Sequence, residues 1–313
     1  MKGRRGALDV TGRIDTTDAA RVETEVARIY RALYAREPAV ALGQAFDDGA
    51  RLYSGEFPGY AGCDTGYHDL QHALEVTLAM ARLLDGYERW RGADPAIGGR
   101  LFQFGVLCAL FHDAGYIRRA RDRGRGNGAS YADRHVGRGA RFLRAYLRAA
   151  GMPDLADAGS RMLRFTEFGR RVASIRTASA LQARVGRFLG SADLVAQLAD
   201  PCWLEKWRER LYPEIVSSGV ALRRSPAGEL LSVSSHQDLL RHAPRIFRTG
   251  LDRLEIEFGG AYEYGRGHFG GEDPYGDAIR RNLGIAERVA AEAGHSATVA
   301  AVDNRQSHLP QRA

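Results

Sequence analysis

Cysteine, lysine and long apolar runs are scarce in this chain of 313 residues, and each scarcity excludes a class of protein. The three cysteines, Cys63, Cys108 and Cys202, are far apart and form no Cys-x-x-Cys pair, so we expect reduced, mostly buried thiols rather than a disulfide framework. No apolar stretch is long enough to cross a bilayer. The basic residues at 1–5 are not followed by the apolar segment that a signal peptide needs. We therefore expect a cytoplasmic protein without a membrane partner.

Lysine occurs only at Lys2 and Lys206, so arginine supplies nearly all of the net charge of +7. The arginines are spread along the chain, a pattern that does not indicate a nucleic-acid surface, and we expect no nucleic-acid partner. A mildly positive field still attracts small phosphate esters. Internal repeats and long strand-like alternation are also lacking, which predicts a mainly α-helical protein.

The chain divides into a long central part and two short ends. We expect a loose, polar segment over 1–18, a single helical domain over 19–302 with its motifs in 60–220, and a flexible tail over 303–313. The first helix is expected to begin at a cap on Thr17 or Asp18. Further helices are expected over 235–258, broken around Pro244, and over 277–293.

Histidines and carboxylates recur at three places: His68 with His72, the adjacent pair His112 and Asp113, and later Asp193. If the first segment is helical, its two rings project from one face, one turn apart, so one can bind a metal while the other faces a substrate. The adjacent pair ends an apolar run whose length suits a buried helix, which places it at a pocket floor. Any one of these histidines alone is typical of a core or surface residue. Together they predict a site for one or two divalent ions, Zn, Mn, Mg or Fe.

Taken in order along the chain, the motifs resemble those of the HD-domain metal-dependent phosphohydrolases, and among them the class I 3',5'-cyclic-nucleotide phosphodiesterases. The matching segments are 67–76, YHDLQHALEV, with Asp69 where asparagine is usual; 130–143, SYADRHVGRGARFL; 161–168, RMLRFTEF; 191–194, SADL; and 205–219, EKWRERLYPEIVSSG. The resemblance implies an all-α, HD-domain or phosphodiesterase-like multi-helix bundle with a metal site in a central pocket.

The resemblance also implies roles for individual residues. The protein ligands of a first metal would be His72, His112, Asp113 and Asp193, and Asp113 would bridge to a second metal. His68 would be the general acid that protonates the departing ester oxygen. The residues expected to touch the substrate or support the ligands are Tyr67, Asp69, Tyr116, His135, Thr166 and Glu167. The implied activity is phosphodiester hydrolysis, on a cyclic nucleotide or a similar small phosphate ester, by metal-activated water.

The sequence departs from the family pattern at several positions. Tyr116 stands where a histidine near the second metal is usual, and Ala132 stands where a glutamate is usual, with Asp133 adjacent. The Asn-Pro that normally follows the late aspartate is missing, and only Gln237 lies near the expected base-binding glutamine. Two alternatives therefore stay open: an HD-type diiron oxygenase, and a catalytically weak nucleotide-binding sensor.

Three loops lie near these motifs. The segment 53–66 is either a pocket wall or a packed connector, and the basic segment 118–128, RRARDRGRGNG, is either a phosphate contact or a solvated loop. The glycine-rich segment 259–275 is a candidate cap over the pocket.

Overall fold

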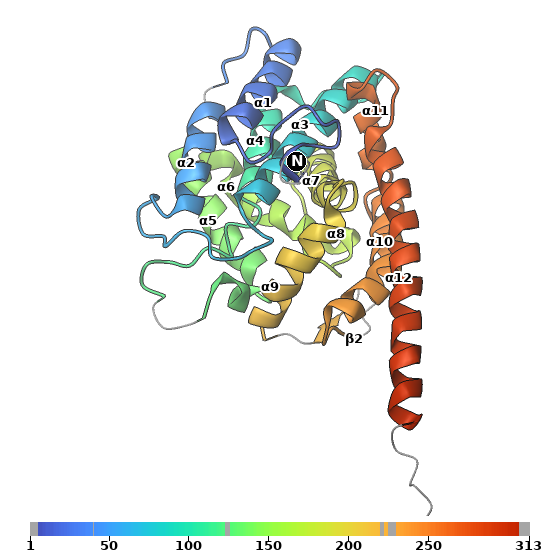
Figure 1. Cartoon of the computed structure of the whole chain (residues 1–313). Helices are drawn as coiled ribbons and strands as arrows, with labels where there is room; N and C mark the ends of the chain where they lie inside the picture. Colours follow the sequence, from blue (N-terminus) through green and yellow to red (C-terminus); the bar gives the residue numbers. More distant parts are fainter. Residues whose placement is uncertain (1–5, 40, 123–125, 220–221, 225–229, 307–313) are drawn as a thin grey trace, which may run out of the picture.

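The computed structural model describes residues 6–39, 41–122, 126–219, 222–224 and 230–306, and helices make up most of them (Figure 1). The longer helices are α1 (Ala19–Leu33), α2 (Leu42–Ser54), α3 (Leu70–Trp90), α4 (Gly98–Leu110), α5 (His135–Ala149), α7 (Ala180–Leu198), α10 (His236–Asp252) and α12 (Pro274–Gln306). The predicted mainly α-helical class is therefore confirmed. A short antiparallel hairpin of β1 (Leu222–Arg224) and β2 (Leu230–Ser232) accompanies the helices.

Short helical segments connect the long ones. These are η2 (Gly128–Tyr131), η3 (Pro153–Leu155), α6 (Ala156–Met162), η4 (Leu163–Phe165), η5 (Val172–Ser174), α8 (Trp203–Lys206), η6 (Trp207–Leu211), α9 (Tyr212–Ser217), η7 (Arg253–Glu257), η8 (Ala261–Tyr264) and α11 (Gly265–His268).

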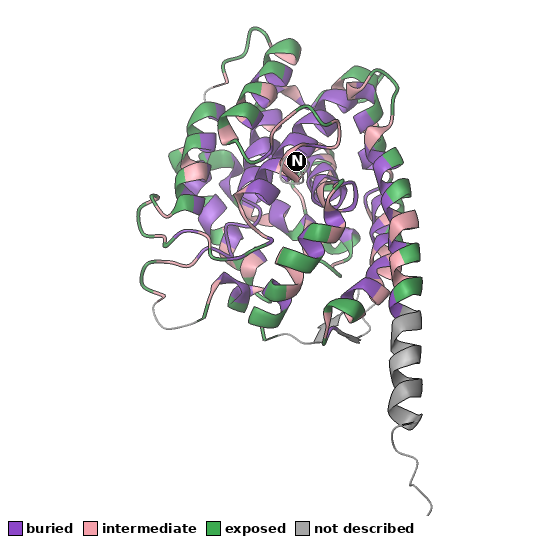
Figure 2. Ribbon diagram, viewed as in Figure 1, coloured by how far each residue is buried: buried purple, intermediate pink, exposed green. Residues whose placement is uncertain are grey.

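Helix α3 lies at the centre of the molecule and packs against α1, α4 and α7. Nearly every residue from Gln71 to Tyr87 is buried, so α3 is covered on all sides, as its apolar sequence requires. Helix α4 corresponds to the predicted buried helix, and its residues from Phe102 to Leu110 are all buried. Figure 2 shows the buried residues concentrated in this central region, with exposed residues on the outer helices.

The N-terminal segment differs from the loose chain that the sequence suggested. Over the described residues 6–18 it packs against α3, where Asp9 accepts a hydrogen bond of 2.6 Å from Arg82 and both side chains are buried. The Asp9 carboxylate also accepts from the backbone N–H groups of Arg13 and Ile14, each at 2.9 Å. Asp18 then caps α1, as one of the two predicted caps, by accepting from the backbone of the first turn.

Two features of the C-terminal helices also differ from the prediction. Helix α10 continues through Pro244, although a proline inside a helix removes one backbone hydrogen bond and costs about 3 kcal/mol. The apolar face of α10 offsets this cost, because Phe247 is buried against Trp203 at 5.0 Å between ring centroids and the helix packs along α12. Helix α12 runs beside α10 on one side of the molecule (Figure 1) and extends beyond the predicted range of 277–293 in both directions. Residues 307–313 of the predicted tail lie outside the described residues.

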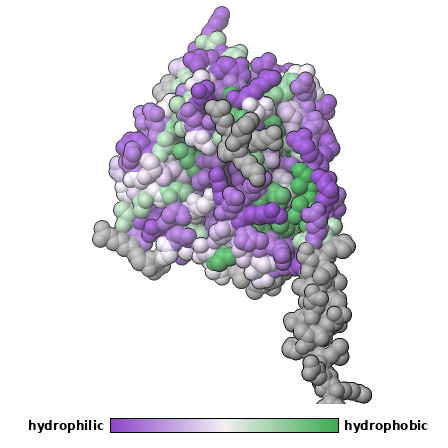
Figure 3. Space-filling model, in the orientation of Figure 1, coloured by the Kyte–Doolittle hydropathy of each residue, from purple (hydrophilic) through white to green (hydrophobic). Residues whose placement is uncertain are grey.

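The face of the molecule in Figure 3 is a mosaic of hydrophilic residues and smaller hydrophobic groups. Within the described part of the chain, none of the helices combines the length and the apolar character that a membrane span needs.

Candidate metal centre

Three helices bring the four predicted ligand side chains together. His72 lies in the first turn of α3, His112 and Asp113 lie in the tight turns that follow α4, and Asp193 lies in α7. All four side chains are buried. Ligand atoms of His72, His112 and Asp113 lie within 4.8 Å of one another, a spacing that one metal ion can span.

The distances place both histidine nitrogens against carboxylate oxygens. His72 Nε2 is 3.7 Å from Asp113 Oδ2 and 3.4 Å from Asp193 Oδ1. His112 Nε2 is 3.1 Å from Asp113 Oδ2 and 3.9 Å from Asp193 Oδ1. These distances place the four groups around one point, with each histidine nitrogen facing both carboxylates.

Both Nε2 atoms are fully buried and lack a hydrogen-bond partner within the described part of the chain. Such groups cost free energy unless a partner enters, which a metal ion does. At His112 the ring orientation supports this interpretation, because Nδ1 lies 2.7 Å from the Ala109 carbonyl oxygen and donates its proton there. In the neutral ring the lone pair is then on Nε2, the nitrogen that faces the carboxylates. The donor set of two imidazoles and two carboxylates therefore fits a borderline or hard divalent cation.

The charges in the cluster are strongly coupled. Burial lowers the pKa of His112, but the adjacent Asp113 carboxylate outweighs it and raises that pKa to about 9. Burial raises the pKa of Asp113, yet the positive charges of His112, His68 and His135 bring it well below its usual range. The centre therefore holds its carboxylates ionised, and an entering cation competes with a proton on His112.

His68 lies before α3, not in it. Asp69 caps the helix by accepting from the backbone N–H of His72 at 3.0 Å, so the helix begins at Leu70 and the expected helical spacing of His68 and His72 is wrong. The two rings still lie near each other, with centroids 5.8 Å apart.

Glu214 of α9, a residue that the sequence did not single out, fixes His68 in this position. One carboxylate oxygen makes a hydrogen bond with His68 Nδ1. The other oxygen accepts from the backbone N–H groups of Tyr67 at 2.8 Å and His68 at 3.2 Å. Burial raises the pKa of Glu214, but His68 and these hydrogen bonds outweigh it and lower that pKa. An ionised carboxylate thus orients the ring.

Tyr116 is sandwiched between two imidazole rings. It stacks on His68 with centroids 4.4 Å apart and on His135 with centroids 4.3 Å apart, both nearly parallel. His135 Nδ1 lies 2.6 Å from the Ala132 carbonyl oxygen, and its Nε2 is 3.8 Å from Asp113 Oδ1. The two Asp113 oxygens thus face different histidines, with Oδ2 toward His72 and His112 and Oδ1 toward His135.

Gly115 allows this arrangement of the turn against α5. A Cβ atom at this position would lie 1.8 Å from the His135 carbonyl oxygen, so only glycine permits the close approach. The close contact sets the position of His135 relative to Asp113.

The remaining predicted site residues lie in several places. Asp69, besides capping α3, lies 3.3 Å from the Arg210 guanidinium, and Tyr67 is buried beside His72. Thr166 donates to the Leu163 carbonyl oxygen at 2.9 Å, and Glu167 pairs with Arg170 at 2.5 Å. The structure thus gives Thr166 and Glu167 local partners instead of contacts with the four ligands.

One further residue supports the ligands without having been predicted. Gln197 donates to Asp193 Oδ1 at 2.7 Å from the next turn of α7. The four-residue spacing of Asp193 and Gln197 along one helix is the signal that indicates such a contact. For Glu214 the signals are its place in the matching segment 205–219 and its apolar neighbours in 212–216.

The glycine-rich segment 259–275 does not cap this centre. It packs against the C-terminal half of α3, where His268 Nδ1 lies 2.6 Å from Asp85 Oδ2. Asp85 and His72 are separated along α3 by about 20 Å at 1.5 Å per residue. The segment therefore stabilises the far end of the central helix.

Comparison with known proteins adds no relative: no family model, curated protein or solved structure is significantly similar to this chain.

Proposed function

We propose that the protein is a metal-dependent phosphohydrolase of the HD type, most simply a phosphodiesterase acting on a cyclic nucleotide or a similar small phosphate ester. The observation that supports this proposal best is the pair of buried Nε2 atoms of His72 and His112, which have no hydrogen bond of normal geometry within the described part of the chain and face two buried carboxylates at 3.1 to 3.7 Å. A protein core keeps such polar groups only where they have a use, because each is costly when unpartnered.

His72, His112, Asp113 and Asp193 would hold the ion. A divalent cation bound there supplies an acidified water near neutral pH and neutralises charge on phosphoryl oxygens. Gln197 fixes one oxygen of Asp193, and the Ala109 carbonyl fixes the tautomer of His112. These contacts hold the ligands in position before the ion enters, which favours affinity.

His68 would protonate the departing ester oxygen. Its Nδ1 is engaged by Glu214, so Nε2 is the nitrogen that would deliver the proton. The Glu214 carboxylate orients the ring through Nδ1, and the stacked ring of Tyr116 holds the plane of the imidazole. His68 and Glu214 resemble other dyads of a histidine and a carboxylate, in which the acid orients the ring and stabilises its charge.

The decisive experiment combines metal content with turnover. Protein loaded in turn with Zn, Mn, Mg or Fe is assayed against cyclic nucleotides, nucleotides and simple phosphodiesters, and bound metal is measured by mass spectrometry. We expect hydrolysis of at least one phosphodiester by the wild type, and loss of both tight metal binding and turnover in Asp113→Asn. The matched control is Asp154→Asn, because Asp154 is an exposed acid paired with Arg100 away from the centre.

The other outcomes separate the two alternatives. Normal turnover in Asp113→Asn would refute the metal mechanism. Oxygen consumption by iron-loaded protein, without phosphodiester hydrolysis, would identify an oxygenase. Tight nucleotide binding without turnover in fully metallated protein would identify a sensor.

A further inference from the structure

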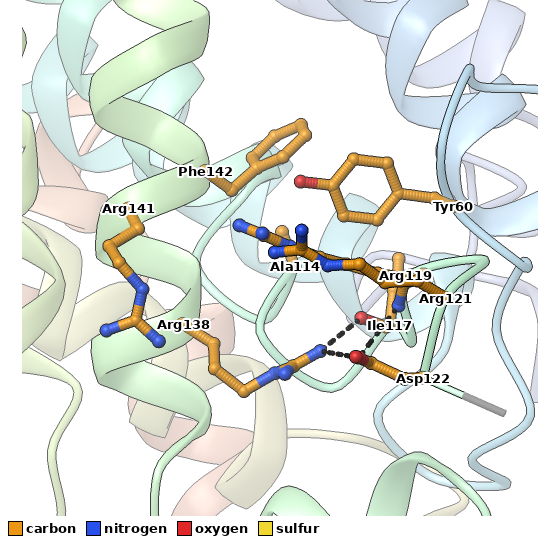
Figure 4. A pocket seen from close by; sticks show the side chains of 9 residues that line it. All are labelled: Tyr60, Ala114, Ile117, Arg119, Arg121, Asp122, Arg138, Arg141 and Phe142. Carbon is orange, nitrogen blue, oxygen red and sulfur yellow. Dashed lines mark hydrogen bonds and ion pairs between the residues drawn. The ribbon is translucent and has the colours of Figure 1, made fainter. Parts of the chain in front are cut away.

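A cavity of about 250 Å³ is lined in part by Ala114, the residue after Asp113, and four of its nine lining residues are arginines. Four guanidinium groups, those of Arg119, Arg121, Arg138 and Arg141, line it together with the single carboxylate of Asp122. In Figure 4 Arg119 and Arg121 extend across the cavity, while Arg138 and Arg141 approach from α5. Positive charge therefore exceeds negative charge within a small concave space.

Among the residues that the structure describes, Arg138 is the one of these arginines that has an ion pair. Arg138 lies 3.1 Å from Asp122 and donates to the Gly115 and Ile117 carbonyl oxygens at 2.8 Å and 3.1 Å. The side chains of Arg119, Arg121 and Arg141 have no ion pair with any residue that the structure describes. Neighbouring guanidinium groups repel one another, and a multiply charged anion relieves that repulsion.

The cavity wall is held together by contacts between segments far apart in the sequence. The backbone of Ala61 donates to the Arg118 carbonyl oxygen at 3.0 Å, and that of Ala120 donates to the Gly59 carbonyl oxygen at 3.0 Å. Tyr60 packs edge-on against Phe142 of α5, with ring centroids 5.4 Å apart. The arginines therefore extend from a braced frame, which lowers the ordering cost of binding a ligand.

From this geometry we propose a second ligand site, specific for an oligophosphate: an inorganic polyphosphate or the phosphate end of a nucleoside polyphosphate. Planar guanidinium groups bind phosphate oxygens in bidentate fashion, and three uncompensated ones match an anion with three or more charges. The volume lies just below the roughly 300 to 1,000 Å³ typical of sites for whole drug-sized ligands, so the cavity suits the phosphate chain itself.

This site is separate from the metal centre. None of the four predicted metal ligands lines the cavity, and the two sites share only the turn in which Asp113 precedes Ala114. An oligophosphate here would be bound by arginine alone, without a cation. The site therefore does not depend on the phosphohydrolase proposal.

The test is calorimetric titration of sodium tripolyphosphate into the full-length protein, at 150 mM NaCl and with a chelator present. The test variant is Arg119→Gln with Arg141→Gln, and the matched control is Arg144→Gln with Arg148→Gln. Arg144 and Arg148 lie on the same helix as Arg141 but face Asp157, outside the cavity. Each double variant loses two positive charges, so the two variants differ in where the charges are lost and not in how many. Circular dichroism and melting temperature check that both variants fold.

We expect the cavity variant to bind tripolyphosphate at least about 100-fold more weakly than the wild type, because each lost charge-assisted hydrogen bond weakens binding about tenfold or more. The control should stay within about threefold, the residual effect of net charge. Equal weakening in both double variants, or no binding by the wild type at millimolar tripolyphosphate, overturns the proposal.

Two further arms identify the source and location of the anion. Equal affinity for tripolyphosphate and a nucleoside triphosphate indicates recognition of the phosphate chain alone. Tighter binding of the nucleotide, lost in Tyr60→Leu, indicates that the base also contacts the wall. Asp113→Asn should bind tripolyphosphate as the wild type does, and a tenfold loss in this variant would place the anion at the metal centre and refute a second site.

Discussion

Replacing Glu214 by glutamine tests whether His68 acts as the general acid. The amide keeps the shape of the side chain and retains an oxygen that can accept from the backbone N–H groups of Tyr67 and His68. It removes the negative charge beside His68 Nδ1 and places a neutral group there. The change therefore alters the charge and tautomer of the imidazole while leaving the backbone contacts in place.

The magnitude follows from the bond that is lost. A hydrogen bond between charged groups contributes about 1.5 to 3 kcal/mol, so its loss in the transition state lowers kcat about 10- to 100-fold. Removal of the imidazole itself, in His68→Gln, should cost the full effect of a general acid, about 10²- to 10⁴-fold. Glu209→Gln is the matched control, because Glu209 lies in the same helical region and is exposed.

The assay compares two phosphodiesters that differ only in the leaving group, a phenyl ester and a p-nitrophenyl ester. Phenol leaves poorly and needs a proton, whereas p-nitrophenol leaves as the anion, so loss of general acid catalysis slows the phenyl ester more. We expect Glu214→Gln to lower kcat for the phenyl ester by the larger factor. Equal losses for both esters would assign Glu214 a purely structural role, and unchanged rates for both would refute the role of the dyad.

Three further predictions concern stability. Asp9→Asn should lower the free energy of unfolding by about 3 kcal/mol in urea, because it leaves Arg82 buried without its counter-charge. Burial raises the pKa of Asp9, but Arg82 and the backbone bonds outweigh it and lower that pKa. The stabilisation is therefore present above about pH 4, near the pKa of an aspartate in the unfolded chain, and it is lost as the pH falls through the lower pKa of Asp9 in the folded protein. Acid should therefore destabilise the wild type more steeply than the variant. Gly115→Ala should lower the melting temperature, since the new Cβ would lie 1.8 Å from the His135 carbonyl oxygen, and an unchanged melting temperature would contradict this packing. Zinc at 100 times its dissociation constant should stabilise the wild type by about 2.7 kcal/mol in calorimetry and leave Asp113→Asn unaffected.

The sequence predicts local features well because they depend on neighbouring residues. The apolar run before His112 predicts a buried helix, and α4 lies over this run. A helix that is apolar on all sides is stable only where other elements cover it. Asp18 caps α1 as predicted, because the capping bond joins residues two or three positions apart.

Features that depend on distant partners were missed or predicted wrongly. Glu214 contacts His68 across 146 residues, and no spacing rule connects the two. The composition of the N-terminal segment predicts a loose chain, but its Asp9 pairs with Arg82, 73 residues away. Pro244 normally ends a helix, but here the packing of α10 on α12 outweighs the local penalty. In each case tertiary contacts override a correct local rule.

Tyr116 bears on how many metal ions the proposed site can hold. Instead of an imidazole, this position has a phenol ring stacked between His68 and His135, and a phenol has no ring nitrogen that could bind a metal. Among the described residues, His135 is then the one imidazole near Asp113 Oδ1, at 3.8 Å. Under the proposed function, two donors hold an ion more weakly than four, so we expect one ion at His72, His112, Asp113 and Asp193 and no tightly bound second ion beside His135. The tyrosine instead packs against both imidazoles, and Glu214 orients the His68 ring through its Nδ1 atom.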